Sequence, residues 1–180
     1  MKELYFAALV LPEELNTEIA VYKQRMLDDF GCRVALRSPA HITLLPPFRM
    51  DAAQESALVA ALDDCLAGIS PFMVSTNGFG SFRPRTIFIE PVMSDALAAL
   101  KKQVDVFARN NTSFGAAADV RPFHPHITIA TRDLSREAFA VAWTDWADQP
   151  FAREWRADGL SLLRMGQKKW EVINTSPFRL

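Results

Sequence analysis

The chain has 180 residues, of which 49% are hydrophobic and 23% are charged. This balance is typical of a globular protein and excludes the disordered, collagen-like and coiled-coil classes. With 20 Lys and Arg residues against 21 Asp and Glu residues, the formal net charge is −1. A surface that coats long nucleic acid needs a strong positive excess, so that class is excluded and any anionic ligand must bind at a local site.

The N-terminal region carries no pattern of a membrane span or a signal peptide. Its longest apolar run covers residues 4–11, far short of the roughly 20 residues that a membrane-spanning helix needs. Pro12 and two glutamates follow where a signal peptide would show small residues. Cys32 and Cys65 have neither metal-ligand spacing nor the density of a disulfide scaffold. We therefore expect a cytoplasmic protein without membrane contact, and a monomer.

Four segments repeat apolar residues with the period of an amphipathic helix. In chain order they cover residues 13–30, 51–69 and 94–110 and the segment that starts near Ser135. Eight short runs have the composition of β-strands: residues 4–10, 33–36, 41–45, 72–76, 86–90, 126–131, 159–165 and 169–174. The order of these elements lacks the strict alternation of a doubly wound sheet, and no glycine-rich phosphate loop follows a strand. The sequence therefore predicts an α+β fold with antiparallel or mixed sheets.

One tetrapeptide occurs twice, about half a chain apart. Residues 41–44 read His-Ile-Thr-Leu and residues 126–129 read His-Ile-Thr-Ile. Side chains at positions i and i+2 of a strand point to the same face. Each copy therefore presents an imidazole and a hydroxyl together, backed by two aliphatic side chains. The spacing indicates two related lobes, whose histidines and threonines would meet if the lobes face each other.

Two histidines with two hydroxyl groups suit metal-free cleavage of a phosphodiester. One imidazole can activate the attacking oxygen while the other protonates the leaving oxygen, because the ordinary pKa of histidine lies near 6.5. The threonine hydroxyls can donate hydrogen bonds to the non-bridging oxygens as their charge grows. Our working assignment gives His126 the activation of water and His41 the protonation of the ribose oxygen. The near-equivalence of the two motifs leaves the reverse assignment open.

The paired motif resembles the hallmark of the two-histidine phosphoesterase superfamily, in particular the bacterial RNA 2′,3′-cyclic phosphodiesterases, also called 2′-5′ RNA ligases. Similar segments elsewhere extend the resemblance over nearly the whole chain: residues 4–15, 79–84, 121–126 and 170–172. The resemblance implies a bilobal α+β fold with pseudo-twofold symmetry, in which two sheets flanked by helices surround a central cleft. Residues 1–180 would then form a single domain made of two related lobes.

The same resemblance implies a hydrolase that opens 2′,3′-cyclic phosphates without a metal or another cofactor. The catalytic residues would be His41, Thr43, His126 and Thr128. The substrate would be an RNA 3′ end or a cyclic nucleotide. Joining of RNA ends through 2′-5′ bonds, hydrolysis of another small cyclic phosphate and a non-catalytic module that binds RNA ends remain as alternatives.

The distribution of charge independently favours an anion-binding cleft. Residues 30–50, 71–89 and 120–132 contain no Asp or Glu, although they hold all three histidines and seven arginines. Among these arginines, Arg132 follows Thr128 by four residues and is our candidate for a phosphate contact. Phe48 and Phe123 flank the two motifs and are candidates for stacking on a base.

A metal site is the remaining alternative for the histidines. His124 and His126 could lie on one strand face, and His41 could supply a third zinc ligand. The repeated threonines would then have no role, so we predict no metal site and a structural role for His124.

Overall fold

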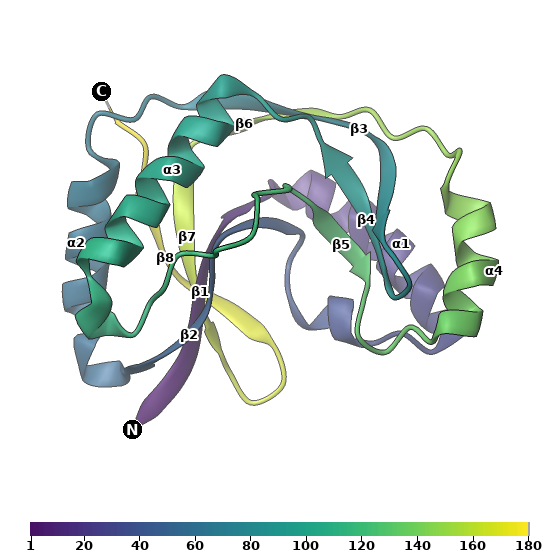
Figure 1. The fold of residues 1–180 in the computed structure, drawn as a ribbon, viewed down its shortest axis with the longest axis horizontal. Helices are drawn as coiled ribbons and strands as arrows, with labels where there is room; N and C mark the ends of the chain where they lie inside the picture. Colours follow the sequence, from purple (N-terminus) through teal and green to yellow (C-terminus); the bar gives the residue numbers. More distant parts are fainter. Residues whose placement is uncertain (180) are drawn as a thin grey trace.

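A computed structural model of the chain describes residues 1–179 (Figure 1). Its strands are β1 (Lys2–Val10), β2 (His41–Asp51), β3 (Phe72–Phe82), β4 (Thr86–Pro91), β5 (Ile127–Ala130), β6 (Glu154–Ala157), β7 (Gly159–Met165) and β8 (Trp170–Pro177). Its α-helices are α1 (Glu13–Phe30), α2 (Glu55–Leu66), α3 (Asp95–Asn110) and α4 (Arg136–Trp146). None of the described helices is long and apolar enough to cross a membrane.

The strands form two separate four-stranded sheets, and every paired strand is antiparallel to its neighbour. The first sheet has the order β2-β1-β7-β8 and the second has the order β5-β4-β3-β6. The α+β fold with antiparallel sheets is therefore confirmed. Each copy of the repeated tetrapeptide belongs to a strand at the edge of its sheet, and these two edges, β2 and β5, are in contact.

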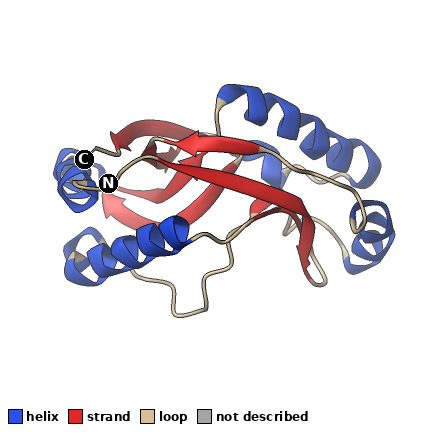
Figure 2. Ribbon diagram, turned by 90° about the horizontal axis from the view of Figure 1, so that it is seen from above, coloured by secondary structure: helices blue, strands red, loops and turns tan. Residues whose placement is uncertain are grey.

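The helices surround the strands, and two of them pack on the sheet to which their preceding strand does not belong. Helix α1 follows β1 of the first sheet but contacts β5 of the second. Helix α3 follows β4 of the second sheet but contacts β2 of the first. Figure 2 shows the strands in the middle of the molecule with helices on either side. This exchange of helices ties the two sheets together around their facing edges.

Local sequence features mark the ends of three helices. The side chains of Ser94 and Ser135 accept hydrogen bonds from the backbone amides of Leu97 and Ala138, and so cap α3 and α4. Gly31 ends α1 in a left-handed conformation with φ of 72°, which favours glycine because a side chain is strained there.

Several strands differ from the prediction, among them β3, which runs to Phe82 beyond the predicted 72–76. Residues 33–36 fall on a 3₁₀ turn (Val34–Arg37) instead of a strand. Strand β2 continues through Pro46 and Pro47, which an edge strand tolerates because one side of it needs no ladder hydrogen bonds. Strand β6 escaped prediction because four residues are too few to show a clear alternation, and its pairing with β3 is decided by tertiary contact.

Candidate active site

The two tetrapeptides lie on the facing edges of the two sheets. His41 begins β2, and His126 directly precedes β5. The four aliphatic residues of the motifs are fully buried, whereas their histidines and threonines are half-buried. The two strands that carry the motifs are in contact, and a positive charge on His126 lowers the pKa of His41.

Both histidines are oriented by the same type of hydrogen bond. Nδ1 of His41 lies 2.7 Å from the carbonyl oxygen of Pro39, and Nδ1 of His126 lies 2.8 Å from that of His124. A carbonyl oxygen can only accept a hydrogen bond, so Nδ1 must carry the proton in both rings. This fixes the tautomer of each neutral imidazole and leaves Nε2 to accept or transfer a proton.

Two side chains of α1 hold the segment that precedes His41. The Asn16 side chain accepts a hydrogen bond from the amide of Ala40 and donates one to the carbonyl of Leu11. The Lys23 ammonium donates to the carbonyl of Ser38 at 2.9 Å. Backbone groups of three successive residues before His41 are therefore engaged, two of them by α1. The roles of Asn16 and Lys23 leave no pattern in the sequence, because only the tertiary fold brings α1 against this segment.

The first sheet surrounds His41 with apolar side chains. The ring centroids of Phe6 and His41 are 4.9 Å apart, and Trp170 meets the ring of Phe6 edge-on at 4.5 Å. Phe6 belongs to a small cluster, separate from the main core, with Ala8 and Leu163, and Val10 and Trp170 pack at its border. This cluster lies on the face of β1 that carries Val10 and Ala8, which pair with His41 and Thr43.

The second sheet places two phenylalanines against His126. The centroid of Phe82 lies 5.0 Å from that of His126, and the centroid of Phe88 lies at 5.6 Å. Phe88 is buried, whereas Phe82 keeps 38% of its surface exposed beside the imidazole. Gly80 pairs with Phe88 across the sheet, and a Cβ atom there would overlap the ring of Phe88. Gly80 lies in the part of β3 that extends beyond the predicted strand at residues 72–76, so only the structure shows this close approach.

His124 connects the second motif to β4. Its Nε2 atom lies 3.3 Å from a carboxylate oxygen of Glu90, while its carbonyl oxygen accepts the hydrogen bond of His126. In the register of β4 and β5, Ile89 pairs with Ile127, so Glu90 lies next to His126. The corresponding neighbour of His41 is Val10, which has no charge.

Burial lowers the pKa of both imidazoles. The pKa of His41 falls to about 4, because burial disfavours its charged form and the charges of Lys23 and His126 add to this effect. The hydrogen bond to Pro39 opposes the shift. The pKa of His126 is also lowered, mainly by burial and further by the charges of His124 and Arg121.

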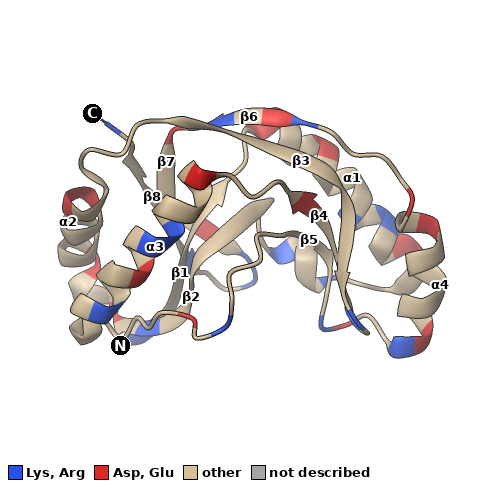
Figure 3. Ribbon diagram, turned by 45° about the horizontal axis from the view of Figure 1, so that its top comes forward, with Lys and Arg blue, Asp and Glu red and all other residues tan. Residues whose placement is uncertain are grey.

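The predicted phosphate contact lies at the far end of β5. Arg132 is exposed in the turn after this strand, close to the β3–β4 turn, where Arg83 and Arg85 are also exposed. The two turns are joined by a 3.2 Å hydrogen bond between the hydroxyls of Thr86 and Thr131. In the ribbon of Figure 3, basic residues are coloured at both turns, whereas most of the length of β1, β2 and β5 is uncharged. The three arginines form a basic end of the second sheet.

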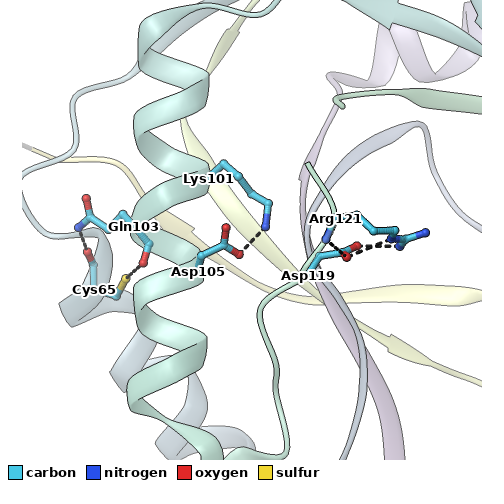
Figure 4. Close-up of polar contacts among 6 residues, drawn as sticks. All are labelled: Cys65, Lys101, Gln103, Asp105, Asp119 and Arg121. Carbon is cyan, nitrogen blue, oxygen red and sulfur yellow. Dashed lines mark hydrogen bonds and ion pairs between the residues drawn. The ribbon is translucent and has the colours of Figure 1, made fainter. Parts of the chain in front are cut away.

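The two predicted stacking residues have different surroundings. Phe48 is buried in the main core and stacks on Tyr5 with ring centroids 5.9 Å apart. Packing in the core therefore accounts for this residue. Phe123 is half-buried and lies in the segment before His126, with the Lys101 ammonium 5.6 Å from its ring centroid. Figure 4 shows Lys101 extending from α3 toward the loop in which Asp119 holds Arg121.

Within residues 1–179, no group of three or more His, Cys, Asp or Glu side chains is arranged so that it could hold a metal ion. His124 is instead paired with Glu90. Its position therefore gives it a role in supporting the segment before His126.

Comparison with known protein families assigns this chain to a superfamily. The model of the 2′-5′ RNA ligase superfamily matches residues 11–169, a range that includes both tetrapeptides. The chain belongs to this superfamily, which is one of two-histidine phosphoesterases. A comparison with curated protein sequences found no significant match.

Solved structures show that the superfamily fold extends over the whole chain. The protein TT0787 of Thermus thermophilus has a TM-score of 0.71 at 20% identity, with 98% of both chains covered. Escherichia coli LigT in complex with 3′-AMP has a TM-score of 0.68 at 18% identity, with 100% of both chains covered. LigT in complex with ATP has a TM-score of 0.66 at 17% identity over the same share. These neighbours establish the fold.

Proposed function

We propose that this member of the superfamily hydrolyses 2′,3′-cyclic phosphodiesters at RNA ends or on nucleotides. The observation that carries the proposal is the paired geometry of the two motifs. On two strand edges in contact, each imidazole donates its Nδ1 proton to a backbone carbonyl and keeps Nε2 for proton transfer. Two such groups are what an in-line displacement at phosphorus needs.

The proposed reaction is balanced by the two histidines alone. One neutral imidazole accepts a proton from water as the water oxygen bonds to phosphorus. The bond from phosphorus to one ribose oxygen breaks, and the other imidazole, initially protonated, gives its proton to that oxygen. The products are a phosphomonoester and a free hydroxyl. Exchange of protons with solvent then restores the starting state of both rings.

The threonines and arginines have supporting roles in this proposal. Thr43 and Thr128 lie on the same strand faces as the histidines and would donate hydrogen bonds to the non-bridging phosphate oxygens. Arg132, with Arg83 and Arg85 nearby, would attract the negatively charged end of the substrate. Because the site needs both sheets, residues 1–180 would act as one domain of two lobes.

Nucleotide complexes of a structural neighbour agree with this substrate class. LigT was crystallised with 3′-AMP, with ATP and with NADP+. These ligands all contain a phosphorylated adenosine, so the fold accommodates nucleotides. We transfer this binding to the present chain as part of the proposal.

The proposal is tested with 2′,3′-cyclic AMP and with a short RNA that ends in a 2′,3′-cyclic phosphate, in the presence of excess chelator. We expect wild-type protein to open the ring. His41→Ala and His126→Ala should each lose about 10²–10⁴-fold in turnover while circular dichroism shows an intact fold. The position of the phosphate in the product identifies the bond that breaks.

Each alternative gives a different result in the same assay. Near-wild-type turnover by both histidine variants would contradict the two-histidine mechanism. Loss of activity with chelator and recovery with zinc would instead support a metal site. Binding of RNA ends without turnover, unchanged in the histidine variants, would support the binding module. Formation of longer RNA from suitable ends would favour 2′-5′ joining.

A further inference from the structure

A pocket of about 310 Å³ lies beside the second motif and has no part in the proton transfers described above. It is lined by residues 90–93 at the end of β4, residues 123–125 before His126, and Asn77 of β3. Its volume is at the lower end of the range for small-molecule sites. The pocket shares His124 with the support of His126, so a ligand bound there would be next to the reacting phosphate.

The walls of the pocket combine apolar side chains with polar groups. Val92 and Met93 each expose 45% of their surface although both are large hydrophobic residues. Phe123 contributes an aromatic ring, and its position is supported by the Lys101 ammonium. Exposed apolar side chains around a concave site are typical of a ligand-binding surface. A flat aromatic ligand fits such walls because it can stack or lie against them.

The charge of the pocket selects against a phosphate. Glu90 is the acidic residue of β4. One carboxylate oxygen lies 3.3 Å from Nε2 of His124, and the other has no hydrogen-bond partner within residues 1–179. A carboxylate can only accept hydrogen bonds when ionised. The preferred ligand is therefore an apolar ring system that carries N–H donors.

We propose that this pocket binds a nucleobase of the substrate and prefers bases that offer N–H groups to Glu90, with guanine first. Guanine presents two adjacent N–H donors, which match the two oxygens of a carboxylate. Adenine and cytosine present an amino group beside an acceptor nitrogen. Uracil presents an N–H group between two carbonyl oxygens, which a carboxylate repels. The inference rests on the proposed function and adds the specificity of the same site.

The test compares substrates that differ in one base. The first arm uses the four 2′,3′-cyclic mononucleotides. The second uses trinucleotides with a terminal cyclic phosphate that differ only in the penultimate base. We expect kcat/KM for guanine to exceed that for uracil by about tenfold or more, since hydrogen bonds to charged groups are strong. A preference for guanine over uracil among the mononucleotides places the terminal base in the pocket. The same preference among the trinucleotides alone places the penultimate base there.

The variant Glu90→Gln keeps the size of the side chain and removes its charge. We expect it to bring the guanine-to-uracil ratio close to one, mainly by lowering kcat/KM for guanine. Asp63→Asn is the matched control, because Asp63 is an exposed acid on α2 that is not among the pocket-lining residues. This control should leave the ratio unchanged.

Two results would overturn the inference. The first is equal kcat/KM for all bases in both arms by active wild-type protein, which leaves the proposed function intact. The second is an unchanged ratio in Glu90→Gln. If no cyclic phosphate is opened at all, the proposed function fails, and the pocket is then judged by calorimetric binding of 3′-GMP and 3′-UMP. Tighter binding of 3′-GMP that is lost in Glu90→Gln supports the pocket, and equal binding contradicts it.

Discussion

The two copies of the tetrapeptide are nearly identical in sequence and are set in different environments. His41 is held by a proline carbonyl in a segment fixed by α1, and the buried ammonium of Lys23 is close to it. His126 is held by the carbonyl of His124, whose side chain pairs with Glu90. Positive charge thus acts on both imidazoles, from the buried Lys23 at His41 and from His124 and Arg121 at His126, and only the second motif has an acidic neighbour, Glu90, paired with His124.

This difference shows how a duplicated motif can acquire two roles. The orientation of each imidazole comes from the local hydrogen bond to residue i−2, which both copies share. The surrounding charge comes from elements that the motif does not include. The titrations of two such imidazoles in one site are coupled, so the apparent pKa values belong to the pair.

The largest effect is expected from the groups that the two motifs share. Thr43→Val and Thr128→Val each remove a hydroxyl without changing the shape of the side chain. If both hydroxyls stabilise the phosphate oxygens, each variant should lose about 10²–10³-fold in kcat. Thr17→Val, at an exposed position of α1, is the control. Loss in only one of the two site variants would show that the motifs differ in function as well as in surroundings.

The pH dependence tests the lowered pKa values of His41 and His126. The reactive state needs one neutral and one protonated imidazole. Because both pKa values lie below the ordinary 6.5, the protonated fraction of the free protein decreases as the pH rises above that value. We expect kcat/KM to fall by up to about tenfold per pH unit between pH 7 and 8. A maximum of kcat/KM at pH 8 would contradict this interpretation.

Replacement of Lys23, the buried cation near His41, should make the surroundings of His41 and His126 more alike. Burial lowers the pKa of Lys23 from 10.5 to about 8. Between pH 8 and pH 10.5, unfolding therefore takes up a proton. Below pH 8 Lys23 is charged in both states, so the free-energy cost of burying its charge is fully present at pH 7. This cost is about 3 kcal/mol, whereas Lys23→Met leaves the Ser38 carbonyl without its donor, which costs about 1 kcal/mol. Lys23→Met should be more stable than wild type at pH 7, by roughly 2 kcal/mol on these values.

The advantage of Lys23→Met should shrink as the pH rises from 8 to 10.5, because wild-type Lys23 then loses its charge in the folded state and no longer bears the cost of burying it. Thermal melts between pH 8 and pH 10.5 measure this difference in stability, and the exposed Lys102→Met is the control. The decline of kcat/KM should also move to higher pH, because Lys23 lowers the pKa of His41. A variant that is less stable than wild type at pH 7 would show that the ammonium is stabilising.

The smallest effect is expected at His124. His124→Ala removes the pairing with Glu90 but keeps the carbonyl group that orients His126. We therefore expect only a few-fold loss of kcat with a cyclic mononucleotide, measured beside His126→Ala. Loss as large as that of His126→Ala would assign His124 a direct part in the reaction.

Local patterns predicted most of the elements. The predicted helical periods are confirmed, and the serine caps of α3 and α4 and the glycine at the end of α1 likewise depend on neighbours within a few residues. The 33–36 segment has a strand-like composition, but its amides at Arg33 and Val34 bond to the Asp133 carboxylate, and it forms a 3₁₀ turn. Such a contact between distant residues leaves no local pattern.

The sequence by itself determined the fold class, the superfamily and the pairing of histidine with threonine. The last follows because a period of two places residues i and i+2 on one face of any strand. Only the tertiary structure decided what surrounds each histidine. Lys23, Glu90, Phe6 and Phe82 reach the site from other elements, because sheet edges and helix packing join residues that are far apart in the chain.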